Sequence, residues 1–178
     1  MLKRILVLTM VIGLISGIGA FTGLAVFTDQ ETVADNTFGS GNVDLVLGTT
    51  TALVTYTNMK PGDTTGPQSL VVTNNGTIDF TYVMSTTMIT DTGTPLLGDA
   101  LDLTIKTIDV TTPGTPCNDF DGTTIYAAAD LNNGAVASRA LSASTNETLC
   151  FEVTFPSAAT GPEGASANAS FVFDATQA

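Results

Sequence analysis

Hydrophobic and polar residues alternate along most of the chain after residue 41, which is the pattern of strands whose two faces meet different environments. Segments rich in β-branched residues are separated by short turns that contain Gly, Pro and Asn. Residues 90–99 and 111–122 are predicted as loops, and residues 127–131 as a short helical turn. The pattern predicts seven strands, at residues 42–47, 52–58, 69–73, 78–87, 101–110, 148–155 and 167–175.

Turn chemistry and the apolar rows within the strands define the expected fold class. Residues 60–63 (Lys-Pro-Gly-Asp) predict a tight turn, and residues 74–76 (Asn-Asn-Gly) predict a turn of the hairpin type. Two strands carry inward-facing rows, Phe151, Val153, Phe155 and Phe171, Phe173, Ala175. Short strands with such turns predict an all-β fold, an antiparallel β-sandwich of Greek-key or jelly-roll type.

An uncharged segment at residues 5–28 precedes the strands and follows the basic residues Lys3 and Arg4. This pattern predicts a cleavable secretory leader, with cleavage between Ala25 and Val26. The segment is also long enough to span a bilayer, so a retained N-terminal anchor is the alternative. The expected organisation is a signal peptide (1–25), a mature N-terminal segment (26–41) and a β-sandwich domain (42–178).

Charge and composition exclude several functions. The chain has 17 acidic residues, 5 basic residues and no histidine, for a net charge of −12. A nucleic-acid partner is excluded because binding phosphates requires a cationic surface. Without histidine, the chain lacks the commonest general base and a common zinc ligand. We therefore predict no catalytic residues, no cofactor and no enzymatic activity.

The two cysteines, Cys117 and Cys150, predict a disulfide in an exported protein. The bond would tie the loop at residues 111–122 to the strand at residues 148–155, and an intermolecular bond is the alternative. Asp119, Asp121 and Asp130, with Asn118, are weak candidates for calcium ligands, because Ca²⁺ prefers oxygen ligands. The alternative is that these carboxylates are solvated turn residues. Sequons for N-glycosylation occur at Asn75, Asn146 and Asn168.

Several segments occur in a characteristic order behind the leader. Phe27-Thr-Asp29 is followed by the sequence NTFGSGNVDL at residues 36–45. Further segments are NMKPGD (58–63), VVTNNGT (71–77), LCFEVTFP (149–156) and SFVFDATQ (170–177). Together they resemble the TasA/camelysin family of secreted biofilm-matrix fibre proteins, and the resemblance covers essentially the whole chain.

The resemblance implies a secreted jelly-roll-like antiparallel β-sandwich that polymerises into fibres of the extracellular matrix or cell surface. It also implies a leader cut by a SipW-type signal peptidase, and it carries a metallo-endopeptidase label. In the fibres, the N-terminal segment of one subunit completes a sheet of the next, which is donor-strand exchange. Here that donor strand would contain Phe27, Val33 and Phe38.

The expected function is therefore a structural protein whose partner is another copy of itself. Two alternatives remain, a camelysin-like cell-surface metallo-endopeptidase and a membrane-anchored monomeric surface or adhesion domain. The N-terminal segment could also pack on its own domain as an ordinary first strand.

Overall fold

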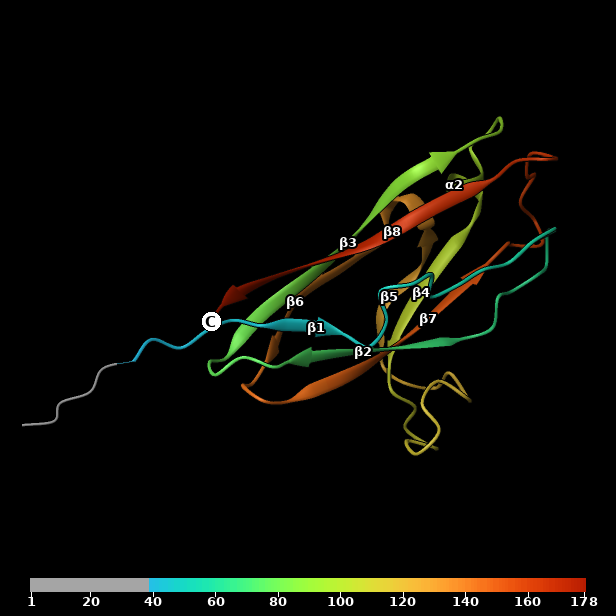
Figure 1. Cartoon of the computed structure of the whole chain (residues 1–178). Helices are drawn as coiled ribbons and strands as arrows, with labels where there is room; N and C mark the ends of the chain where they lie inside the picture. The colour runs from blue at the N-terminus through green and yellow to red at the C-terminus, as the bar shows by residue number, and fades with distance from the viewer. Residues whose placement is uncertain (1–38) are drawn as a thin grey trace, which may run out of the picture. The chain divides into compact units, whose positions relative to one another are not determined.

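The computed structural model describes residues 39–178 (Figure 1). Within them, a four-residue helix, α2 (Leu97–Ala100), and a 3₁₀ helix, η1 (Leu131–Asn133), are the helical segments. No helix in this range is long and apolar enough to cross a membrane. The strands are β1 (Leu45–Leu47), β2 (Gln68–Asn74), β3 (Phe80–Asp91), β4 (Asp102–Thr107), β5 (Thr124–Asp130), β6 (Ala135–Leu141), β7 (Asn146–Thr154) and β8 (Ala167–Gln177).

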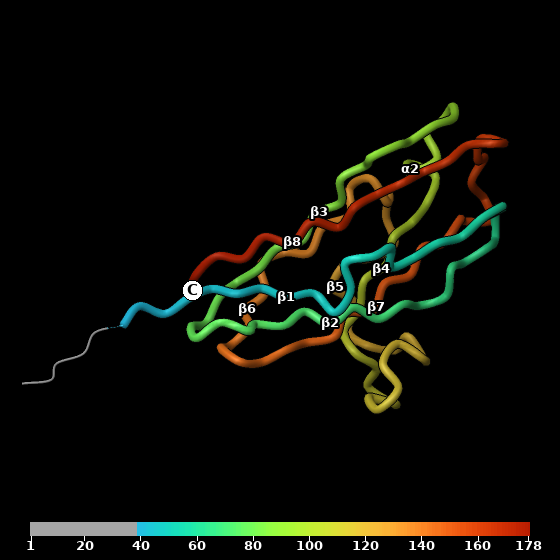
Figure 2. The backbone as a smooth tube through the Cα atoms, viewed as in Figure 1, coloured from blue at the N-terminus to red at the C-terminus, as the bar shows by residue number. Residues whose placement is uncertain are grey.

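The strands form two antiparallel sheets that enclose the core. Figure 2 shows the path of the backbone through both sheets. The large sheet has the order β1-β2-β7-β4-β5, and the small sheet has the order β6-β3-β8. The pairs β2–β7, β3–β6 and β4–β5 are nested along the chain, as in a long hairpin rolled into two layers. The predicted all-β antiparallel sandwich is confirmed.

The core lies between the inward faces of the two sheets. Phe151, Val153 and Phe155 are all buried, as the alternation predicts. The small sheet contributes Phe171 and Phe173, which are partly buried and pack against the same core. The Phe171 ring lies 5.0 Å from the Phe151 ring, centroid to centroid, so aromatic contacts join the two layers. The predicted inward rows of these two strands are therefore confirmed.

Five of the predicted strands correspond to β2, β3, β4, β7 and β8, with ends shifted by up to four residues. The strand predicted at residues 42–47 shrinks to the three residues of β1. The strand predicted at residues 52–58 is wrong. These residues pair with no strand among residues 39–178, although Leu53 and Met59 pack against the core, and Asn58 has a left-handed φ of 57°.

The helical turn predicted at residues 127–131 is also wrong, because residues up to Asp130 belong to strand β5. Strand β6 has no counterpart among the predicted strands. Strands β5 and β6 are both rich in alanine, which has a low strand propensity. They lie at sheet edges, where pairing with β4 and β3 overrides that local preference.

The two predicted turns have different outcomes. The turn at residues 60–63 is confirmed, because the Asp63 amide donates to the Lys60 carbonyl at 2.9 Å and Gly62 has a φ of 97°. The hairpin predicted at residues 74–76 is wrong. Strand β2 belongs to the large sheet and β3 to the small sheet, so this turn carries the chain from one layer to the other.

Candidate functional site

One side of the sandwich is bounded by β1 in the large sheet and β8 in the small sheet, and we call it the open flank. Among residues 39–178, the eleven-residue β8 pairs with β3 alone, so its other edge has no strand partner. Strand β1 covers only the end of β2, from Val72 to Asn74. An exposed strand edge leaves backbone N–H and C=O groups available to an added strand.

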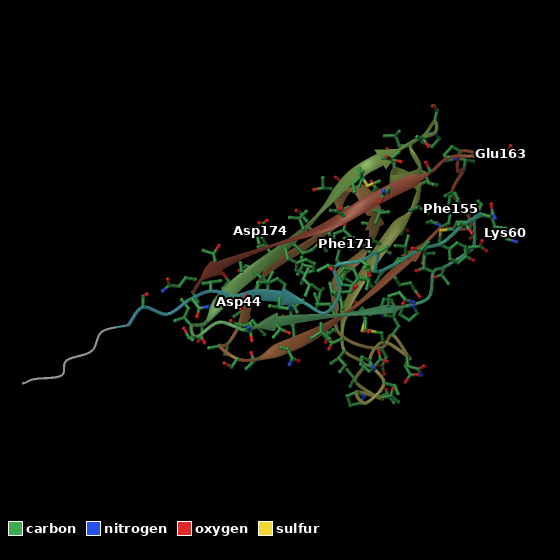
Figure 3. The ribbon with its side chains drawn as sticks, in the orientation of Figure 1. Asp44, Lys60, Phe155, Glu163, Phe171 and Asp174 are labelled. Carbon is green, nitrogen blue, oxygen red and sulfur yellow. A yellow bond between two sulfur atoms is a disulfide. The ribbon has the colours of Figure 1, made fainter. Side chains whose placement is uncertain are left out.

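Apolar side chains at this flank are only partly covered. Phe171 and Phe173 of β8 face inward but keep intermediate exposure, and Figure 3 shows Phe171 between the two sheets. Leu45 and Leu47 of β1 are likewise partly buried against the core. Leu53, from a segment without a ladder, covers part of the same core. In the described part of the chain, the open flank therefore combines a strand edge without a partner and an incompletely covered apolar layer.

The chain that leads into β1 is held on the turn between β2 and β3. Asp44 accepts two hydrogen bonds from Asn75. The Asn75 backbone amide donates to the Asp44 carbonyl at 2.8 Å, and the Asn75 side chain donates to the Asp44 carboxylate at 2.9 Å. The Thr77 amide donates to the Asn42 carbonyl at 3.1 Å. At Gly76, a Cβ atom would lie 2.4 Å from the Asn42 carbonyl oxygen, so the close approach requires glycine. These contacts fix where the described chain enters the open flank.

The residues predicted for the donor strand and for leader cleavage lie outside the described part of the chain. Phe27, Val33 and Phe38 are among them, as is the predicted cleavage between Ala25 and Val26. Their roles stay predictions.

The predicted disulfide is confirmed between Cys117 and Cys150, with a Cα–Cα distance of 5.4 Å. Cys150 points away from the core of the sandwich, because its neighbours Leu149 and Phe151 point inward. It is nevertheless fully buried, so the loop that carries Cys117 covers this part of the outer face of the large sheet. Lys106 holds the same loop, donating to the Phe120 carbonyl at 2.7 Å.

The carboxylates of this loop are occupied by local hydrogen bonds. Asp109 is buried and accepts from the Asp119 amide at 2.7 Å and from the Asp121 amide at 3.3 Å. Asp121 accepts from the Val110 amide at 2.7 Å and from the Thr111 hydroxyl. The hydrogen bond from Thr111 is the main cause that lowers the pKa of Asp121 below its usual value. These bonds shape the loop.

The three predicted calcium candidates do not lie together. Asp119 and Asp121 lie in the loop before β5, whereas Asp130 ends β5 and pairs with Asp102. A seven-residue strand is about 20 Å long, which separates Asp130 from the other two. Within residues 39–178, no group of three or more His, Cys, Asp or Glu side chains could hold a metal ion. The sequon residues Asn75, Asn146 and Asn168 are all exposed.

A hydrogen-bonded network of three polar side chains joins the two sheets. Tyr82 of β3 donates its hydroxyl to the Glu147 carboxylate of β7 at 2.7 Å, and Arg139 of β6 donates to both oxygens of that carboxylate. Sequence reasoning missed this network. The only available signal is that Arg139 and Glu147 interrupt otherwise uncharged segments.

The Tyr82 network predicts a loss of stability at alkaline pH. Burial, then the hydrogen bond to Glu147 and the negative charge of Glu147, raise the pKa of Tyr82 well above 10. Because the pKa is raised on folding, the contribution of Tyr82 is complete below about pH 10 and is lost as the pH rises toward the raised value. We expect the free energy of unfolding to fall by up to about 1.4 kcal/mol per pH unit through this one group.

The measurement is urea unfolding between neutral pH and strongly alkaline pH. Tyr82→Phe cannot ionise at this position, so its alkaline decline should be shallower than that of the wild type. Tyr56→Phe, which changes an exposed tyrosine, is the matched control and should decline as the wild type does. Parallel declines of the wild type and Tyr82→Phe would show that Tyr82 does not carry the effect.

Comparison with known proteins relates residues 3–113 to one family, described as camelysin metallo-endopeptidase. The matched range covers more than half of the chain, from Lys3 to the loop that follows β4. No curated protein matches the chain.

Proposed function

The chain belongs to the camelysin metallo-endopeptidase family and is a cell-surface or secreted protein, and from this premise we propose that it is an extracellular structural subunit that polymerises by donor-strand exchange. In this proposal, the N-terminal segment of one copy adds to the open flank of the next copy. The observation that carries the proposal is the eleven-residue edge of β8, which pairs with no other strand among residues 39–178, beside the partly covered side chains of Phe171 and Phe173.

The length of the N-terminal segment fits this edge. Strand β8 is about 36 Å long at about 3.3 Å per residue, and residues 26–38 could extend over about 43 Å. An added strand would pair its backbone with β8 and place alternate side chains over the core. One copy can therefore supply enough chain to cover the whole edge of another.

The two faces of such a strand differ in charge. In an extended conformation, Phe27 and Val33 share one face with Asp29, Glu31 and Asp35. Of the predicted donor residues, Phe38 alone lies on the other face, which also carries Val26 and Ala34 and no charged residue. We propose that this uncharged face covers Phe171 and Phe173, because burying unpaired carboxylates there would be costly.

The test is the imaging of the exported protein by electron microscopy. A variant that lacks residues 26–36 should form no filaments, because its donor strand is missing. A pair of point variants makes the test sharper. Ala34→Asp places a charge on the face proposed to be buried and should abolish filaments. Val33→Asp places the same charge on the opposite face and should leave them intact.

Two outcomes would contradict the proposal. Undiminished filaments in the deletion variant would show that the N-terminal segment is not the donor. Equal effects of Ala34→Asp and Val33→Asp would show that net charge, and not the buried face, governs assembly. Light scattering of the wild type separates a polymer from a monomer whose N-terminal segment packs on its own domain. N-terminal sequencing of the exported protein separates both from a retained anchor.

The family description implies a metal centre, and the donor groups of the described residues do not fit one. Peptidase zinc sites use histidine, cysteine or carboxylate ligands and keep one position open for water. The chain has no histidine, both cysteines form the disulfide, and the carboxylates of Asp109 and Asp121 accept local hydrogen bonds. We therefore propose a structural function without peptide cleavage. Casein cleavage that a chelator suppresses would contradict this.

A further inference from the structure

The outer faces of the two sheets differ in charge, and we propose that the outer face of the small sheet is a contact surface between copies of this chain. We call it the β6–β3–β8 face. The inference does not depend on donor-strand exchange, because the face is available on single copies and on polymers alike.

The β6–β3–β8 face consists of small, hydroxyl-bearing and β-branched side chains. The inward positions of β3 are Phe80, Tyr82 and Met84, so the residues between them point outward. The register pairs those outward residues with the outward residues of β8 and β6. The face is formed by Thr81, Val83, Ser85, Thr87 and Ile89 of β3, Ser170, Val172, Asp174 and Thr176 of β8, and Ala135, Ala137 and Ala140 of β6.

Among these outward positions, Asp174 is the single charged residue. It lies opposite Val83 in the register, and Figure 3 shows it on the side of β8 turned away from the large sheet. Val83, Val172 and Ile89 are exposed by 42%, 40% and 63%, so the face presents three large apolar side chains to solvent. Exposed apolar side chains on an extended sheet face favour association.

The outer face of the large sheet has a different character. Alternation along its strands places Asp102, Glu152 and Lys106 on the outside, because Leu103, Ile105, Phe151 and Val153 point inward. The disulfide-linked loop, with Asp119 and Asp121, covers part of this face. Two copies cannot bring these large-sheet faces together without opposing their carboxylates.

The distribution of charge determines which face a second copy can use. Residues 39–178 contain 14 acidic and 3 basic residues, a net charge of −11, so identical copies repel each other. Exposed charges are screened beyond about 8 Å at physiological ionic strength, which makes local charge decisive at contact. The β6–β3–β8 face is where two copies can approach with the fewest carboxylates between them.

The area of the face sets the strength of the contact. Strands β3, β6 and β8 have 12, 7 and 11 residues. At about 3.3 Å per residue and about 4.8 Å between strands, they present roughly 500 Å² on each copy. Two such faces would bury about 1,000 Å² together, which is the lower limit for a specific interface. A single contact should therefore be weak and concentration-dependent. Copies aligned in a polymer would add many such contacts and associate side by side.

The test measures self-association of the exported protein by sedimentation velocity at several concentrations and at low and high salt. The Ala34→Asp variant is measured in parallel, so that loss of donor-strand polymerisation does not obscure the result. We expect a weak association that salt strengthens, because salt screens the repulsion between acidic copies. Asp174→Asn, which removes the one charge of the face, should strengthen it severalfold.

Two matched charge insertions locate the contact. Ser85→Glu places a carboxylate at the centre of the β6–β3–β8 face and should weaken association by about tenfold. Ser69→Glu places the same group at an exposed outward position of β2 on the large sheet and should change it by less than about twofold. Circular dichroism confirms that both variants fold. Equal effects of the two insertions would overturn the proposal. So would the finding that the wild type and the Ala34→Asp variant both stay monomeric in all conditions.

Discussion

Replacing both Cys117 and Cys150 with alanine is expected to lower the free energy of unfolding by about 4 kcal/mol. The disulfide joins residues separated by 33 positions, and a closed loop of that size restricts the unfolded chain by about this amount in the chain-entropy model. The melting temperature should fall by about 10 °C, since 1 kcal/mol corresponds to about 2–4 °C in a chain of this length. Urea and thermal unfolding measure both quantities.

A second measurement separates the loop from the sandwich. The bonds that Asp109 and Lys106 make to the loop remain when the disulfide is lost, so the sandwich should keep its circular dichroism spectrum. The loop should become more sensitive to limited proteolysis within residues 111–122. Complete reduction of the wild type in mild denaturant should reproduce the stability of the double variant. A loss of less than about 1 kcal/mol would contradict the loop-closure argument.

Replacing Asn74 with alanine is expected to cost about 3 kcal/mol. The side chain is fully buried and donates to the Ile78 carbonyl at 2.9 Å and to the Leu141 carbonyl at 3.0 Å. Its oxygen accepts from the Gly76 amide at 2.9 Å. Alanine would leave three backbone groups without these partners, and each buried unpaired group costs about 1–3 kcal/mol, part of which water entry recovers.

The neighbouring Asn75 provides the matched control for this prediction. Its side chain is exposed and bonds to Asp44, so Asn75→Ala should cost less than about 1 kcal/mol. Asn74→Asp is the more informative second variant, because a carboxylate accepts from Gly76 but cannot donate to Ile78 and Leu141. If Asn74→Ala were no more destabilising than Asn75→Ala in urea unfolding, the role of Asn74 as a link between the sheets would be wrong.

Sequence alone predicted the parts of the fold where apolar alternation is strong. Strands β7 and β8 carry uninterrupted inward rows such as Phe151, Val153 and Phe155, so their faces could be assigned without a structure. The disulfide was also predictable, because two cysteines in an exported chain leave one intramolecular pairing. Strands β5 and β6 were not predictable, because their alanine-rich sequences become strands only through pairing with β4 and β3.

The candidate site also depends on contacts between distant parts of the chain, which the sequence does not show. The sequence at residues 74–76 has hairpin chemistry locally, and only the sheet order shows that it crosses between layers. The inter-sheet bonds of Asn74, and the partners of Asp109, join residues far apart in the chain, so no local pattern indicates them. The open flank itself depends on which strand lies at each edge, and that order is a property of the whole topology.

The hydrogen bond from the Gly76 amide to Asn74 has a consequence for the deamidation of the protein. In an Asn-Gly sequence, the glycine nitrogen can attack the asparagine side chain, release ammonia and form a succinimide that hydrolyses to aspartate or isoaspartate. Here the Gly76 amide donates to Asn74, and Gly76 is buried in a tight turn. This hydrogen bond retains the proton of the Gly76 amide, which the nitrogen must lose to attack Asn75. For a protein that persists outside the cell, beyond intracellular repair, this restraint preserves the neutral side chain that anchors Asp44.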